Sequence, residues 1–217
     1  MARKKQKPGN MQSLAKFKKA GEKLRISNYE ISYDPIKGQN DNLPKPVKDR
    51  LQDLHDMVKG GNPDQAIEEL LVLKEEYPDV PMLYNYLSAA YEALGNHAAS
   101  RETIIENYQK NPDYLFAKIN YAQICLMNGE TDKVPEIFDG KLDLKLLYPN
   151  RNRFHVTEFS GLSAVVCAYY AASGQHELAQ KLYKTLLEMA PDSEMTRFAL
   201  RFVYPSLLSK LSNLIGR

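Results

Sequence analysis

The chain has 217 residues, of which 43% are hydrophobic and 26% are charged, proportions typical of a globular protein with one or two domains. Its only two cysteines, Cys125 and Cys167, exclude a disulfide-rich scaffold. No apolar run is long enough to cross a membrane, and the basic N-terminus lacks the apolar segment of a secretory signal. We therefore expect a cytoplasmic protein without a transmembrane segment.

The net charge of +2 hides an uneven distribution. Residues 1–25 contain nine Lys or Arg and one acid, so this stretch carries +8 and the remainder carries −6. This pattern indicates a basic N-terminal arm over residues 1–27, joined by a turn-rich linker over 28–45 to a mildly acidic body. Within the linker, Tyr29, Ile31 and Tyr33 alternate with polar residues, as in a short extended segment that packs against the body.

The body of the chain repeats with a period of 34 residues. Glycine-containing turns follow this step at Gly61, Gly95 and Gly129, and Pro78 and Pro112 keep the same spacing. The segments between them are amphipathic and of helical length. Because glycine ends helices and proline precedes new ones, each period predicts two helices joined by a turn.

This pattern resembles the tetratricopeptide repeat (TPR) family. The second unit carries the family's aromatic, Leu-small, Tyr, turn-Gly and closing-Pro positions, at Tyr84, Leu87, Ser88, Tyr91, Gly95, Ile104 and Pro112. The first, third and fourth units match in part, through residues that include Ala66, Leu70, Tyr121, Ala122, Ala179 and Tyr183. The resemblance covers about residues 46–192. It implies an all-α, right-handed α-solenoid of about four TPR-like units, with a capping helix over residues 193–217.

The period is interrupted between the third and fourth units. Gly129 and Gly174 are 45 residues apart, 11 more than one period. This spacing predicts a distorted third unit and an insertion at about residues 139–156. Thr157 is expected to cap the next helix, and Phe154 is expected to anchor the inserted loop on the body.

Three residues of the insertion suggest binding. Arg151, Arg153 and His155 alternate on a predicted loop beside a helix start, and loops on rigid scaffolds often carry binding residues. Two guanidinium groups are suited to a carboxylate or a phosphate. The alternative is that the arginines pair with acids of the body: Asp139, Asp143 or Glu158.

No pattern typical of an active site is present in the sequence. It contains no glycine-rich phosphate loop, nucleophile elbow or Cys/His constellation. His155 and Glu158 have a spacing suited to two metal ligands, but no second pair accompanies them. We therefore expect no catalytic residues, no metal, no cofactor and no enzymatic activity.

Stacked repeats form a concave groove lined by the first helix of each unit. On the register above, the groove residues are Leu51, His55, Asn85, Ala89, Ile119, Asn120 and Gln123. Asn85 and Gln123 either hydrogen-bond a peptide backbone or are solvated polar positions. Some TPR proteins clamp the C-terminal carboxylate of heat-shock chaperones, and of the clamp positions only Asn120 matches here, so chaperone-tail binding is not expected.

These patterns favour a non-catalytic protein-protein interaction scaffold that binds a partner peptide or helix in its groove. The candidate partner-binding residues are His55, Asn85, Asn120 and Gln123, with Arg151, Arg153 and His155 of the insertion. The alternative is a nucleic-acid- or ribosome-associated protein, held by weak contacts of its basic arm. The two differ in salt response, because phosphate contacts weaken steeply with salt.

Overall fold

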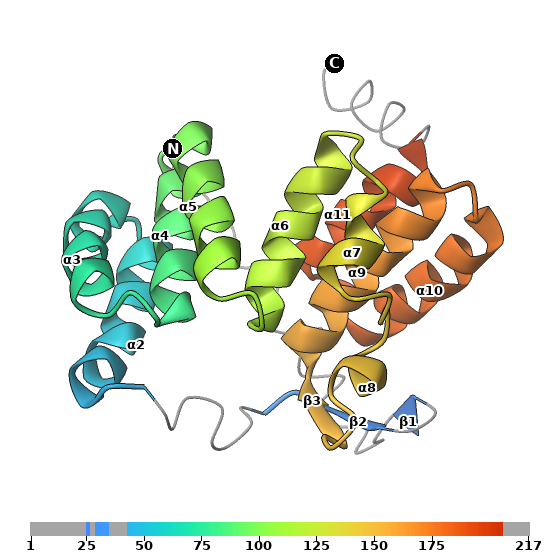
Figure 1. Cartoon of the computed structure of the whole chain (residues 1–217), viewed down its shortest axis with the longest axis horizontal. Helices are drawn as coiled ribbons and strands as arrows, with labels where there is room; N and C mark the ends of the chain where they lie inside the picture. The colour runs from blue at the N-terminus through green and yellow to red at the C-terminus, as the bar shows by residue number, and fades with distance from the viewer. Residues whose placement is uncertain (1–24, 27–28, 35–42, 206–217) are drawn as a thin grey trace, which may run out of the picture.

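The computed structural model describes residues 25–26, 29–34 and 43–205, and these form ten helices and three short strands (Figure 1). The helices are α2 (Lys45–Gly60), α3 (Pro63–Glu76), α4 (Pro81–Ala93), α5 (His97–Lys110), α6 (Leu115–Met127), α7 (Lys133–Ile137), α8 (Leu144–Leu147), α9 (Val156–Ala172), α10 (His176–Met189) and α11 (Glu194–Val203). The strands are β1 (Arg25–Ile26), β2 (Tyr29–Ser32) and β3 (Arg153–His155). The chain is an all-α helical repeat in which successive helices pack on their neighbours. Within the described ranges, no helix is both long and apolar enough to span a bilayer.

The expected helix pairs are α2 with α3, α4 with α5, and α9 with α10, and the expected glycines lie in the turns between them. The turn glycines have positive φ: 92° at Gly61, 72° at Gly95, 77° at Gly129 and 77° at Gly174. Side chains at this φ are strained, whereas glycine adopts it freely. The glycine period therefore marks the helix ends directly.

The third unit is the distorted one. Its first helix, α6, has full length, but its second helix, α7, is only five residues long. Val134, Ile137 and Phe138 of this short segment are nevertheless buried in the core. The chain then continues through α8 and β3 to the fourth unit.

The buried apolar residues form two separate cores. The N-terminal core joins α2, α3 and α4, and the C-terminal core joins α6 to α11 with β2 and β3. Between them, α5 buries polar side chains, namely Ser100, Thr103 and Asn107. All buried side-chain nitrogen and oxygen atoms in the described part of the chain have hydrogen-bond partners, so this polar junction is satisfied.

A small sheet joins the N-terminal strands to the insertion. β2 pairs in parallel with β3, with Ile31 opposite Phe154, and β1 pairs antiparallel with β2. In Figure 1 this sheet lies beneath α8 and α9, under the C-terminal half of the molecule and to the right of α2, although α2 is the next helix after β2 in the sequence. The expected extended segment exists, and its partner is the insertion. Tyr33 strengthens the attachment because its hydroxyl donates a hydrogen bond to the carbonyl of Met189, at 2.9 Å, at the end of α10.

The C-terminal helix α11 packs on α9 and α10. It buries Phe198 and Ala199 in the C-terminal core and so covers that end of the repeat array. The rest of the predicted capping helix, residues 206–217, lies outside the described residues, as does the basic arm before Arg25.

Ala66→Leu is expected to lower the free energy of unfolding by about 1–3 kcal/mol, because added volume in a packed core forces shifts of the surrounding atoms. Ala66 of α3 is 0% exposed in the N-terminal core. Urea unfolding followed by circular dichroism measures the change. Ala98→Leu, at an exposed position of α5, is the matched control and should change stability little. An unchanged midpoint for Ala66→Leu would contradict the tight packing of Ala66 in the N-terminal core.

Candidate partner-binding pocket

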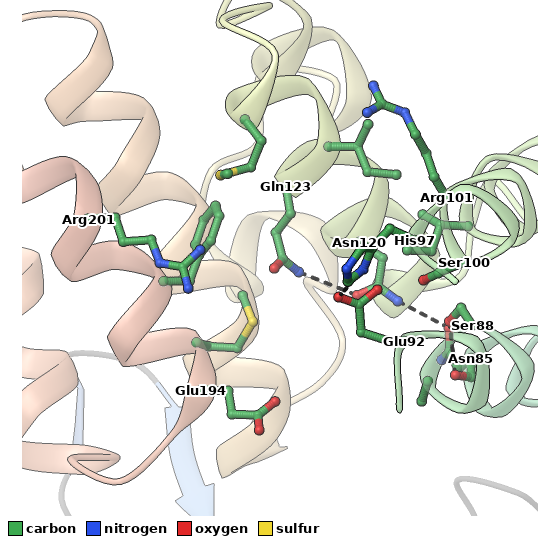
Figure 2. Close-up of a pocket in the computed structure, with 16 residues that line it drawn as sticks. Asn85, Ser88, Glu92, His97, Ser100, Arg101, Asn120, Gln123, Glu194 and Arg201 are labelled. Atoms are coloured by element: carbon green, nitrogen blue, oxygen red, sulfur yellow. Dashed lines mark hydrogen bonds and ion pairs between the residues drawn. The ribbon is translucent and has the colours of Figure 1, made fainter. Parts of the chain in front are cut away.

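A pocket of about 560 Å³ lies between the second and third units and the C-terminal helix (Figure 2). One side is built by α4, α5 and α6, and the facing side by α11. The volume falls within the roughly 300–1,000 Å³ range of ligand pockets. The groove predicted from the repeat register is therefore hollowed at this place.

A chain of amide side chains forms one side of the pocket. Asn85 Oδ1 on α4 accepts hydrogen bonds from Asn107 Nδ2 of α5, at 3.1 Å, and from Asn120 Nδ2 of α6, at 3.2 Å. Gln123 Nε2 donates to Asn120 Oδ1 at 3.4 Å. Gln123 is the open end of this chain, since its Oε1 accepts no hydrogen bond from any other residue that the structure describes. That oxygen is available to a ligand.

Tyr114 holds one end of this row of amides through a hydrogen bond with Asn85. Its hydroxyl accepts a hydrogen bond from Asn85 Nδ2, at 3.4 Å. Burial is the largest cause that raises the pKa of Tyr114 far above its ordinary value, and the charges of Tyr86 and Glu158 add to it. The phenol therefore stays neutral and fixes the orientation of Asn85 over the physiological pH range.

The charged groups of the pocket differ in whether they have partners. Glu92 Oε1 lies 3.0 Å from His97 Nδ1, and Glu194 Oε1 lies 3.8 Å from Arg197. Arg101 of α5 and Arg201 of α11 also line the pocket and are exposed. Neither arginine forms an ion pair or a hydrogen bond with another residue in the described ranges. Figure 2 shows that the two come from opposite sides, with the Arg201 guanidinium directed toward Gln123.

Apolar side chains complete the lining. Met127, at the end of α6, lines the pocket and is one of the few large apolar side chains that are exposed in the described part of the chain, with 59% of its surface accessible. Ile104 and Ile124 are half-buried on the same side, and Met195 and Phe198 face them from α11. Methionine adapts its shape to irregular partners, so this surface suits an apolar side chain of a ligand.

Three of the predicted partner-binding residues come together in this pocket: Asn85, Asn120 and Gln123. His55 does not line it. Its ring lies 5.6 Å from the ring of Tyr86, and its Nδ1 lies 3.1 Å from Asp56. Leu51 and Ile119, which were expected near the groove, are instead buried in the N-terminal and C-terminal cores.

The arginines of the insertion have partners within the fold. Arg151 makes a bidentate pair with Glu158, with both N···O distances at 3.0 Å, and the Glu158 side chain is only 3% exposed. Arg153 donates to the Ser32 hydroxyl at 2.9 Å and lies 3.8 Å from Glu30. For Arg151, the alternative of pairing with Glu158 is confirmed. A role of either arginine in partner binding stays a prediction.

His155 caps the helix that follows the insertion, a role expected of Thr157. The His155 ring accepts a hydrogen bond from the Thr157 N–H at 3.3 Å, while the Glu158 carboxylate accepts from the His155 N–H at 2.9 Å. This reciprocal arrangement is a capping box. The insertion residues are not part of the pocket lining.

Sequence reasoning missed the side of the pocket that α11 forms. Glu194, Met195, Phe198 and Arg201 all come from this helix. The sequence predicted only that residues 193–217 cap the end of the array, and a capping role does not specify which other part of the array the helix faces. The residues of α5 that line the pocket, His97 and Arg101 among them, were also missed, because only first helices were expected there.

In the described ranges, no group of three or more His, Cys, Asp or Glu side chains is arranged to hold a metal ion. Cys125 and Cys167 are both buried and unpaired. Burial raises the pKa of Cys167 to about 12, and a thiol held protonated in this way is a poor nucleophile.

The fold and the pocket define a helical-repeat protein with an open pocket on its surface. No family model matches the chain, and no solved structure matches it. The chain is 27% identical over 165 residues to the TPR repeat-containing protein YvcD of Bacillus subtilis (strain 168). The aligned part covers 76% of this chain and 31% of that relative, so the chain spans less than a third of the relative's length.

Proposed function

We propose that this chain is a non-catalytic protein-interaction scaffold that binds a segment of a partner protein in the pocket between α4, α5, α6 and α11. The supporting observation is the convergence of Asn85, Asn120 and Gln123, from two successive units, on one open pocket. Side-chain amides both donate and accept hydrogen bonds, as a peptide backbone requires. The similarity to a TPR repeat-containing protein supports the same class.

The lining favours a peptide over a reacting substrate. Amides and apolar side chains make up most of it. The Glu92 carboxylate lies 3.0 Å from the His97 ring, and the Glu194 carboxylate lies 3.8 Å from Arg197. Ser88 and Ser100 also line the pocket, but in the described part of the chain neither hydroxyl is hydrogen-bonded to His97, as an activated nucleophile would be; the Ser88 hydroxyl donates to the Asn85 carbonyl at 3.0 Å. Attachment to RNA or the ribosome would depend on residues 1–27, of which only Arg25 and Ile26 are described. No observation favours that alternative, so it is not proposed.

A photo-crosslinking residue placed at Met127 should capture one defined partner protein from the host lysate, at low and at high salt and after nuclease treatment. The same residue at Val72, 57% exposed on α3 and outside the pocket, is the control position. Ala89→Trp fills the pocket from an exposed position of α4 and should abolish the capture. Ala98→Trp, exposed on α5 outside the lining, should not.

Two outcomes would contradict this function. If positions 127 and 72 capture the same set of proteins, the pocket is not selective. If capture at position 127 disappears with nuclease or high salt, the contact is with a phosphate backbone.

A further inference from the structure

We infer that the partner segment is acidic: an extended stretch that carries Asp or Glu side chains next to an apolar residue. This inference rests on the proposed function and specifies the chemistry of the partner. It follows from three features of the pocket: two arginines without ion-pair partners among the described residues, a side-chain amide oxygen that accepts no hydrogen bond from them, and an exposed apolar surface.

The first feature is the pair of arginines. Arg101 and Arg201 approach from opposite sides and make no ion pair among the described residues. The two carboxylates of the pocket do have polar neighbours: Glu194 lies 3.8 Å from Arg197, and Glu92 lies 3.0 Å from the His97 ring. A guanidinium presents a fixed fork of donors that matches a carboxylate. A segment between the two sides can therefore place carboxylates on both arginines. A basic segment would meet the same arginines and be repelled, which gives the pocket selectivity as well as affinity.

The second feature is the amide of Gln123. The Oε1 atom of Gln123 accepts no hydrogen bond from the described residues. Gln123 is the last member of the hydrogen-bonded row of amides that begins at Asn85 and continues through Asn120. In a helical partner the backbone N–H groups are already bonded within the helix, whereas an extended partner presents them outward. The free acceptor Oε1 of Gln123 thus favours a partner segment with an extended backbone.

The third feature is apolar. Met127 is 59% exposed, and Met195 and Phe198 face it across the pocket. An apolar side chain next to the acidic residues would bury this surface. Excluding water there would also strengthen the nearby charge pairs, since Coulomb interactions grow as the local dielectric constant falls.

The test uses the full chain and three pools of short random peptides with acetylated N-termini and amidated C-termini. The pools have equal apolar content, and their remaining positions are Asp/Glu, Asn/Gln or Lys. Fluorescence polarisation should show the acidic pool binding about tenfold more tightly than the Asn/Gln pool, a difference of ~1.4 kcal/mol. In the double variant Arg101→Gln, Arg201→Gln this ratio should fall close to one. Lys184→Gln, which removes an exposed positive charge of α10 outside the pocket, should keep it.

Each other outcome overturns the inference in an identifiable way. Equal binding of the acidic and Asn/Gln pools refutes the acidic partner and leaves the proposed function standing. Binding only by an added pool with free C-termini assigns the charge to a terminal carboxylate, against the internal acidic segment inferred here. If no pool binds the wild-type chain, the inference and the proposed function both fail.

Discussion

Phe154→Ala is expected to lower the free energy of unfolding by about 3–5 kcal/mol, the range for truncating a fully buried aromatic side chain. Phe154 is 0% exposed and lies where β3 of the insertion pairs with the N-terminal strand β2. Its ring centroid is 5.1 Å from that of Tyr29, in an edge-to-face arrangement, and 6.1 Å from that of Tyr148. The Arg151 guanidinium lies 4.4 Å from the same centroid. Removing the ring therefore empties a site between β2 and the insertion.

The measurement is urea unfolding of Phe154→Ala beside Leu146→Ala. Leu146 belongs to α8 and is 60% exposed, so its truncation should change stability by no more than about 0.5 kcal/mol.

A double-mutant cycle of Phe154→Ala with Tyr29→Ala should give a coupling of about 0.5–1.5 kcal/mol, as for other aromatic pairs. Zero coupling would refute the pairing of β2 with the insertion.

The repeat architecture could be predicted because its signals are local. Gly61, Gly95 and Gly174 end helices by their own backbone conformation, and the spacing of apolar residues identifies the buried face of each helix. The same register placed Asn85, Asn120 and Gln123 on one surface, because equivalent positions of successive units face the same groove. The structure brings these three residues into one pocket.

Other features depend on contacts between residues distant in sequence. The strand pairing of Ile31 with Phe154 joins segments more than a hundred residues apart. The sequence predicted an extended segment for the first and only a loop anchored by Phe154 for the second, because the periodicity of one segment does not specify its pairing partner. The position of α11 across the pocket is set by its packing on α9 and α10. His155 replaced Thr157 as the helix cap because its ring nitrogen can accept the bond normally given to a hydroxyl, although hydroxyl and carboxamide residues are the usual caps.

Arg151→Ala is expected to cost about 2–4 kcal/mol, because it leaves the carboxylate of Glu158 buried and without its cation. The range is set below that of a fully buried pair because 35% of the Arg151 side chain is exposed. Arg153→Ala is the matched control. The Arg153 side chain is 54% exposed, and its ionic contact with Glu30 is long, at 3.8 Å, so its loss should cost no more than about 1 kcal/mol.

Glu158→Gln in the Arg151→Ala background should recover part of the loss. Glutamine keeps an oxygen for the His155 N–H, which the carboxylate accepts at 2.9 Å, but it carries no charge that needs a partner. Chemical denaturation of the two single variants and the double variant at one pH gives the comparison. Equal and small effects of Arg151→Ala and Arg153→Ala would contradict the structural role of Arg151. In that case both guanidiniums would be free to bind an anion, and the insertion would become a second candidate site for a partner.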